Sequence, residues 1–330
     1  MTLLKLCKSK DEWDDYVLEN GGHPLQLWGW GDVKSTHGWN AYRLQLHDDE
    51  KIIGTVQLLT RKLPWPLKSL AYVPRGPVVN EYNREELLDQ LSNYVNKTLH
   101  SVVLCIEPDE TDYNLTKKWK WRKSNNSILP AKTIILDLNK SETELLSEMS
   151  KKTRQYIRKS ANEAISIKSV KNKDELQKCL EIYHATAKRA GFDIHADSYY
   201  FDIFEKLGDH SQVFAVYVDN KPISFLWIAI SAYTAFELYG GMNDLGQQLR
   251  VSYALKWHVI KKCKEWGLTR YDFGGLIDGG VKTFKMGWCE NETEMIGTLD
   301  LPLSKYYYIW NHGLPTVKMI ARKFKKIFKR

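Results

Sequence analysis

The sequence contains the strand-and-turn segment Ala71-Tyr-Val-Pro-Arg-Gly-Pro-Val78, and a similar segment, Phe236-Glu-Leu-Tyr-Gly-Gly-Met-Asn-Asp244, follows about 165 residues later. Flanking segments correspond at nearly the same offset, since Glu50–Gly54 resembles Asn220–Ser224 and Val103–Glu107 resembles Tyr271–Gly275. A chain that repeats one unit at such a distance is expected to be a duplicated domain.

The hydrophobic pattern predicts the same order of elements in each half. In the first half we expect a helix over 9–20, strands over 41–46, 52–60 and 69–73, a helix over 84–99 and a strand over 102–107. In the second half we expect helices over 173–190 and 198–207, strands over 212–218, 222–230 and 235–239, a helix over 251–266 and a strand over 270–275.

This order predicts an α+β fold of tandem duplicated acetyltransferase-like (GNAT) domains with a central cleft. The predicted boundaries are 1–145 for the first domain, 146–312 for the second and 313–330 for a basic amphipathic C-terminal helix. The hinge is expected within 129–150, where Thr133–Asp137 has the pattern of a strand that crosses from one copy to the other. The alternative is two unrelated mixed domains.

Composition limits the class of protein. The 330 residues are 43% hydrophobic, which is enough to form packed cores, and no stretch has the roughly 18 apolar residues of a membrane span. The N-terminus lacks the apolar run of a signal peptide, so we expect a cytoplasmic protein. The five cysteines are scattered and indicate free thiols, with no metal site.

Coenzyme A is a poor candidate donor. Ordinary GNAT enzymes bind its pyrophosphate with a glycine-spaced loop before a helix. Neither Leu245–Ala254 nor Val79–Glu86, the two segments at that place in the repeat, has this spacing. We therefore expect no cofactor.

Four ordered motifs resemble those of the Fem family of peptidoglycan-bridge aminoacyltransferases (FemABX). They are Gly29-Trp-Gly-Asp-Val-Lys34, Tyr72-Val-Pro-Arg-Gly-Pro77, Tyr271-Asp-Phe-Gly-Gly275 and Phe284-Lys-Met-Gly287. The resemblance covers nearly the whole chain and matches the compact FemX-like type, because the chain lacks room for the coiled-coil arm of longer members. It implies transfer of an amino acid from aminoacyl-tRNA to the stem-peptide amine of a lipid-linked or UDP-linked peptidoglycan precursor.

The resemblance also implies roles for individual residues. Lys285 corresponds to a lysine that stabilises the oxyanion of the ester carbonyl, and Glu107 to a carboxylate that could accept the proton of the attacking amine. Substrate-binding positions are Lys34, Arg75, Tyr239, His195 and Tyr199. One departure is that some relatives have an arginine where this chain has His195 or Ala196. The alternatives are a surface lysine for Lys285 and Lys34, a solvated Arg75, a core Tyr239 and a strand-capping Glu107.

Two basic segments suggest anionic partners. Lys151, Arg154 and Arg158 share one helical face suited to the phosphates of tRNA, with a merely solvated face as the alternative. Residues 316–330 carry seven cations and no acid, and the rest of the chain has 41 bases against 40 acids.

The C-terminal pattern is that of a helix lying in an anionic membrane surface. Its predicted membrane-binding residues are Lys318, Arg322, Phe324, Lys325 and Phe328. We expect a monomer that associates peripherally with the inner face of the plasma membrane, and a tRNA-binding tail is the alternative. Competing functions for the whole chain are an acyl-coenzyme A-dependent N-acyltransferase and a non-catalytic adaptor that binds RNA or membranes.

Overall fold

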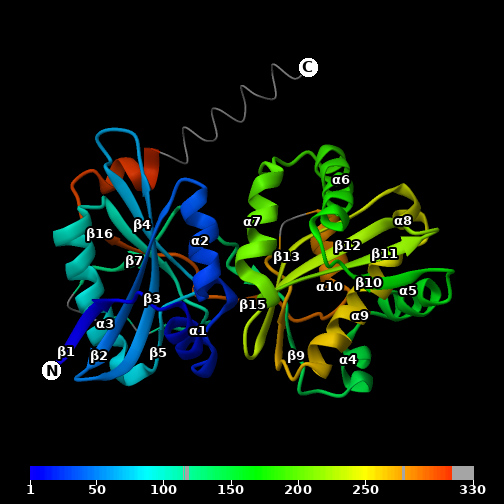
Figure 1. Ribbon diagram of the computed structural model, residues 1–330, viewed down its shortest axis with the longest axis horizontal. Coiled ribbons are helices and arrows are strands. Elements are labelled where there is room, and N and C mark those ends of the chain that lie inside the picture. Colours follow the sequence, from blue (N-terminus) through cyan, green and yellow to red (C-terminus); the bar gives the residue numbers. More distant parts are fainter. Residues whose placement is uncertain (114, 116–118, 277–278, 314–330) are drawn as a thin grey trace. The chain divides into compact units, whose positions relative to one another are not determined.

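The computed structural model describes residues 1–113, 115, 119–276 and 279–313 (Figure 1). The chain forms two compact units. The first unit contains Met1–Ala131 and the described residues from Glu294 onward, and the second contains Lys132–Thr293. The chain passes between the units at two short strands, β8 (Lys132–Thr133) and β15 (Thr293–Glu294).

The first unit is built on one mixed sheet. Its strands lie in the order β1 (Thr2–Leu6), β2 (Asn40–Asp48), β3 (Lys51–Lys62), β4 (Ser69–Pro74), β6 (Val103–Glu107), β16 (Leu299–Pro302) and β7 (Arg122–Lys123), with β5 (Val78–Val79) paired to β3. β4 and β6 run parallel and the other neighbouring pairs run antiparallel. A parallel pair needs a crossover connection, which α3 (Glu81–Tyr94) supplies.

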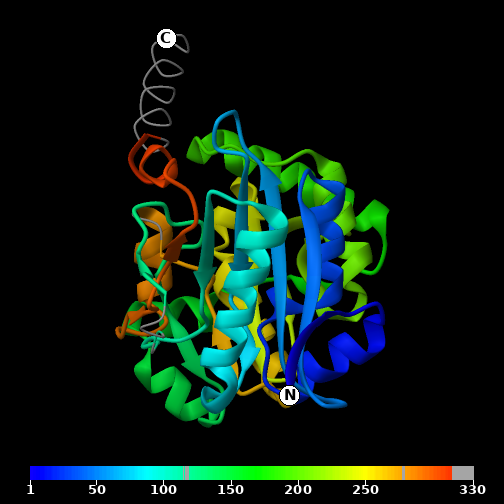
Figure 2. The same ribbon diagram turned by 90° about the vertical axis from the view of Figure 1, so that its left-hand side faces the viewer.

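Alternating side chains of this sheet form two cores. Leu58 and Val73 belong to the core that includes Leu87 and Leu91 of α3, which lies in front of the strands in Figure 2. Tyr72, on the opposite face, packs with residues just before and within the final π-helical turn η4 (Ile309–Gly313). The remaining helical segments are α1 (Lys10–Glu19), η1 (Pro24–Gln26), α2 (Trp28–Thr36) and η2 (Val95–Leu99).

The second unit repeats this topology. Its sheet order is β10 (Ser166–Ser169), β11 (Ser211–Val218), β12 (Lys221–Ile230), β13 (Thr234–Met242), β14 (Arg270–Asp272) and β9 (Ile135–Asp137). β13 and β14 run parallel, joined by α9 (Val251–Glu265), and the other pairs are antiparallel. The β11–β12 hairpin turns at Asp219 and Asn220, whose positive φ values of 48° and 59° suit a tight hairpin turn.

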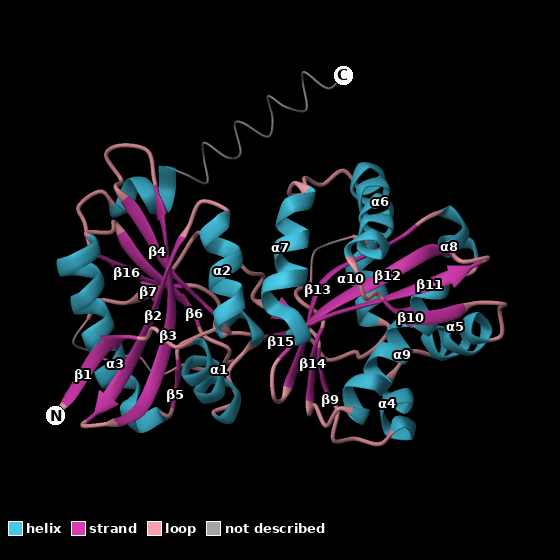
Figure 3. Cartoon of the chain, viewed as in Figure 1, coloured by secondary structure: helices cyan, strands magenta, loops and turns pink. Residues whose placement is uncertain are grey.

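Helices cover both faces of the second sheet (Figure 3). Leu226 and Ile228 of β12 belong to the core that includes α9, whereas Phe225 and Trp227 contact Tyr183 of α6 (Lys173–Ala190) and Tyr200 of α7 (Asp197–Leu207). The other helices are α4 (Glu142–Glu148), α5 (Lys151–Ala161), η3 (Gly208–His210), α8 (Asp244–Gln248) and α10 (Gly280–Met286).

The α+β fold and the duplicated order of elements are confirmed, but the predicted domain boundaries are wrong. The chain first passes from one unit to the other between residues 131 and 132, which lies within the expected hinge. The boundary is not at 145, because β9 pairs with β14 of the second unit. The second domain ends at 293 rather than 312, since β16 pairs with β6 in the first sheet. Among the described residues, none of the helices combines the length and apolarity needed to cross a bilayer.

Candidate functional site

The second unit brings three predicted substrate-binding residues into one aromatic cluster. Tyr200 of α7 lies between them, with its ring centroid 5.0 Å from that of Tyr239 and 5.7 Å from that of Tyr199. The ring of His195 lies 4.1 Å from that of Tyr199, and the backbone N–H of His195 donates to the Tyr200 hydroxyl at 3.1 Å. Three residues that the sequence predicted to bind substrate therefore lie together, and their contact with a substrate stays a prediction.

The tyrosines of this cluster present protonated hydroxyl groups. Burial raises the pKa of Tyr239 well above its usual value, and the adjoining tyrosines add to the shift. Burial likewise raises the pKa of Tyr199 to about 12. These phenols stay protonated at physiological pH, so they can pack against an apolar group and hydrogen-bond a polar one without placing a negative charge beside it.

Lys285 lies on α10, the helix that follows the loop after β14. Its ammonium donates hydrogen bonds to the carbonyl oxygens of Phe273 and, at 2.8 Å, Gly275. The side chain is half-buried on a helix, so the alternative of a surface lysine on a loop is wrong. An ammonium has three N–H donors, and these two bonds with described residues fix its position while leaving the third for another acceptor.

A buried ion pair lies close to Lys285. Lys256 of α9 is 4% exposed, and its ammonium is 2.7 Å from a carboxylate oxygen of Glu237 on β13. The Tyr271 hydroxyl donates to the same carboxylate at 2.8 Å. Burial lowers the pKa of Lys256 to about 8; Glu237 opposes this shift and the positive charge of Lys285 adds to it.

Aromatic rings surround this ammonium. The Lys256 nitrogen lies 4.1 Å from the ring centre of Phe273 and 5.0 Å from that of Phe284. The ring faces stabilise the cation where water is excluded. Because Phe273 also presents its carbonyl to Lys285, the two lysines are linked through one residue.

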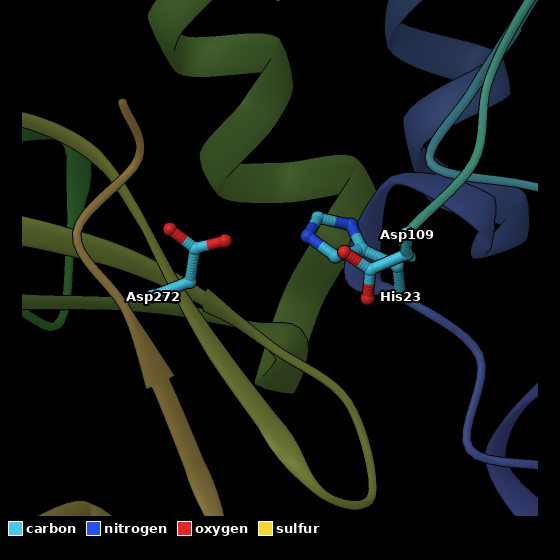
Figure 4. A group of neighbouring side chains, drawn as sticks. All are labelled: His23, Asp109 and Asp272. Atoms are coloured by element: carbon cyan, nitrogen blue, oxygen red, sulfur yellow. The ribbon is translucent and has the colours of Figure 1, made fainter. Parts of the chain in front are cut away.

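The loop after β14 is shaped by Asp272, a fully buried carboxylate drawn in Figure 4. Its oxygen accepts from the hydroxyl of Thr133 at 2.5 Å and from the backbone N–H of Gly274 at 2.9 Å. Gly274 has a φ of +71°, and a Cβ there would lie 2.3 Å from the carbonyl oxygen of Glu237. Only glycine fits, and the turn directs the carbonyls of Phe273 and Gly275 to Lys285.

In the first unit, Lys34 lies in the last turn of α2, beside an aromatic ring. Its ammonium is 4.5 Å from the ring centre of Trp30. Burial lowers the pKa of Lys34 to about 8, and the charge of Arg61 adds to the shift. The α2 helix was not among the expected elements, because its Gly29 and Gly31 disfavour helix.

Arg75 is buried in the Pro-Arg-Gly-Pro turn rather than solvated. A guanidinium nitrogen of Arg75 lies 4.0 Å from a carboxylate oxygen of Asp109. Figure 4 draws Asp109 together with His23, which is a buried residue of the first unit. Gly76 is required at this turn, since a Cβ would lie 2.5 Å from the Gln26 side chain. A substrate contact for Arg75 stays a prediction.

Glu107 is a fully engaged buried carboxylate at the end of β6. It accepts hydrogen bonds from the Tyr72 hydroxyl, from the Thr298 hydroxyl at 2.5 Å, and from the backbone N–H groups of Ile128 and Leu129 at 3.0 and 3.1 Å. A general base needs a lone pair that reaches the proton it removes. We therefore assign Glu107 a structural role and no proton transfer.

The basic residues of α5 differ in their surroundings. One nitrogen of Arg154 donates to three carbonyls at the end of α4, including that of Met149 at 2.6 Å. Lys151 and Arg158 are exposed. Arg154 thus fixes α4, and the other two present charge to the solvent. The predicted membrane-binding residues Lys318, Arg322, Phe324, Lys325 and Phe328 lie outside the described residues.

Sequence reasoning missed the Glu237–Lys256–Tyr271 network. A signal was present, because Lys256 shares a helical stripe with Val259, Ile260 and Cys263, all of which are buried. A lysine inside an apolar stripe predicts a buried charge with a partner.

Comparisons with known proteins agree with the fold. The lipid II:glycine glycyltransferases of Staphylococcus epidermidis and Staphylococcus haemolyticus are 24% and 28% identical to this chain, each covering 92% of it and 94% of the relative. These alignments extend over 393 and 396 positions, so the relatives contain inserted segments that the 330-residue chain lacks.

Two solved structures share the fold. The crystal structure of FemX superimposes with a TM-score of 0.82 at 21% identity, covering 93% of this chain and 98% of FemX. A tandem GNAT protein from the clavulanic acid biosynthesis pathway gives 0.54 at 10% identity, covering 92% and 99%. Residues 9–129, 120–224 and 219–314 match the FemAB family, and the chain therefore belongs to the FemAB family.

Proposed function

We propose that this protein transfers an amino acid from aminoacyl-tRNA to the stem-peptide amine of a peptidoglycan precursor, and that the precursor is lipid-linked. The observation that carries the proposal is the Lys285 ammonium, which two backbone carbonyls hold in position within a family whose relatives include lipid II:glycine glycyltransferases. We choose a lipid-linked acceptor because the name of those relatives specifies lipid II.

The reaction is the aminolysis of an ester. The amine nitrogen of the acceptor attacks the carbonyl carbon, the bond from that carbon to the ribose oxygen breaks, and the tRNA hydroxyl leaves with a proton. Negative charge develops on the carbonyl oxygen during the attack, and an ammonium placed beside it stabilises that charge. Lys285 supplies its third N–H to this oxygen. Direct attack by the amine on the ester requires no covalent enzyme intermediate.

Binding roles are divided among the other predicted residues. Tyr239, Tyr199 and His195 form an aromatic cluster that suits the peptide portion of the acceptor. Lys34 contacts a phosphate of the precursor, and the exposed Lys151 and Arg158 contact tRNA phosphates. We also keep the proposal that the protein is a monomer at the inner membrane surface.

The decisive experiment uses the purified full-length protein with charged tRNA and either lipid-linked or UDP-linked precursor. Mass spectrometry is expected to detect addition of one amino acid to the lipid-linked acceptor, and none when tRNA is uncharged. A parallel reaction contains acetyl-coenzyme A as the donor. Acyl transfer from coenzyme A alone, or no mass gain with any donor, would contradict the proposed function.

Lys34 gives a prediction about pH. Its pKa is lowered to about 8, so the ammonium loses its proton as the pH rises through that value. A neutral lysine holds phosphate poorly, and we expect the KM for the acceptor to rise between pH 7 and pH 9. Replacing Lys34 with arginine, which stays charged, should remove this rise, and Lys34→Ala should raise KM about 10- to 100-fold at pH 7.

Initial-rate measurements across this pH range provide the check. The exposed Lys10 of α1 offers a control, because Lys10→Ala should leave KM and its pH dependence unchanged. If the arginine variant follows the pH profile of the unmodified protein, the phosphate contact is not made by Lys34.

A further inference from the structure

One end of the first unit is cationic and rich in exposed aromatic residues. It comprises the β3–β4 hairpin (residues 61–68), the segment 96–102 and the segment 303–313, and we call it the hairpin face. Figure 1 and Figure 2 both place the hairpin and the segment coloured red at this end. Leu63 and Leu67 of the hairpin share a hydrophobic cluster with Tyr306, Tyr307 and Trp310, so the segments are packed together.

Large apolar side chains project from this face. Trp65 at the hairpin tip is 92% exposed, Tyr308 is 65% exposed and Ile309 is 50% exposed. Tryptophan and tyrosine concentrate at membrane–water interfaces, where an amphipathic ring lies at the level of the headgroups. A cluster of such residues on one end of a folded unit needs a partner that accepts apolar surface.

The same face is positively charged. The three segments carry Arg61, Lys62, Lys68, Lys97 and Lys305 and contain no aspartate or glutamate. All five of these side chains are exposed. The chain continues from this face into residues 314–330, where the sequence adds seven cations and no acid.

A cavity of about 180 Å³ opens between the three segments. Its polar lining includes Lys68, His100, Ser101, Ser304, Lys305 and Tyr306. Two ammonium groups and several hydroxyl or imidazole donors around one space are the chemistry that binds a phosphate diester. This space lies between the same segments that carry the exposed aromatic residues.

We infer that the hairpin face docks on an anionic phospholipid bilayer, with Trp65, Tyr308 and Ile309 entering the interface and Lys68 and Lys305 holding a headgroup phosphate. RNA is the other polyanion that suits such charge. The exposed aliphatic Ile309 favours the bilayer, because it gains from contact with acyl chains and gains nothing from a nucleic acid. The residues substituted in the test below, Trp65, Lys68 and Lys305, have no role in the proposed reaction, so membrane docking and catalysis are tested independently.

The test measures binding of the full-length protein to vesicles that contain phosphatidylglycerol, by sedimentation. The variant Lys68→Gln with Lys305→Gln should bind about thirtyfold more weakly, since each basic residue near an anionic surface contributes on the order of 1 kcal/mol. Trp65→Ala should weaken binding about tenfold through lost apolar contact. Vesicles of phosphatidylcholine alone should bind the unmodified protein poorly.

Matched controls lie elsewhere on the first unit. Tyr82 is 95% exposed at the start of α3, so Tyr82→Ala removes an exposed ring away from the hairpin face. Lys8→Gln with Lys10→Gln removes two exposed charges. Both controls should bind vesicles like the unmodified protein.

Three outcomes would overturn the inference. Unchanged vesicle binding by the Lys68→Gln and Lys305→Gln variant would assign attachment to another part of the chain. Equal binding to phosphatidylcholine vesicles would exclude recognition of the anionic headgroup. If Trp65→Ala weakens binding to tRNA as much as binding to vesicles, the hairpin face is a nucleic-acid surface.

Discussion

Replacing Lys285 with alanine should lower kcat for aminoacyl transfer about 100- to 1,000-fold, the usual effect of removing one oxyanion donor. KM for either substrate should change little, because the interaction forms mainly as charge develops on the ester oxygen. The measurement is the single-turnover transfer of a labelled amino acid from charged tRNA to the lipid-linked precursor.

Lys282 provides the matched control for this variant. It lies on the same short helix α10, and its ammonium pairs with Glu292 at 2.8 Å. Lys282→Ala should leave kcat unchanged. Because Lys285 also bonds the carbonyls of Phe273 and Gly275, circular dichroism must show that Lys285→Ala keeps its fold. A folded Lys285→Ala protein with full activity would refute the proposed role.

Replacing Lys256 with methionine should lower the free energy of unfolding by about 3–5 kcal/mol, as expected when one member of a buried ion pair is removed. The variant leaves the Glu237 carboxylate buried without its cationic partner, although the Tyr271 hydroxyl can still donate to it. Methionine has a similar length and preserves the packing against Phe273, so the effect reports on charge. Urea denaturation provides the measurement.

A double variant separates the charge effect from a packing effect. Lys256→Met combined with Glu237→Gln has no unpaired charge, and the glutamine oxygen can still accept from the Tyr271 hydroxyl. We expect this protein to recover most of the lost stability. If the double variant is as unstable as the single one, the loss comes from packing and the ion pair is not what stabilises this region.

Local signals in the sequence predicted many elements well. The helix expected over 173–190 was found with those bounds, because Asn172 caps its start by accepting from the backbone N–H of Glu175 and Gly191 ends it at a φ of +73°. The β11–β12 hairpin matches the strands expected over 212–218 and 222–230, and it turns at Asp219 and Asn220. Caps and turns depend on residues that are close in sequence, and a single chain is enough to recognise them.

Elements that depend on distant residues were missed. The α2 helix contains two glycines, and it is held by Arg43 of β2, which lies 3.8 Å from the Trp28 ring centre and 2.5 Å from Asp32. β16 joins the first sheet beside β6, although nearly two hundred residues separate them. No local pattern predicts that a strand will pair with a partner so distant in the sequence.

The sequence by itself determined the α+β duplication, the order of most elements and the family resemblance. Only the tertiary structure showed that Glu107 is fully hydrogen-bonded, that Arg154 fixes α4, and that Lys256 is a buried partner of Glu237. The reason is physical: periodicity and caps are properties of neighbouring residues. The burial and pairing of a charge depend on which distant groups surround it after folding.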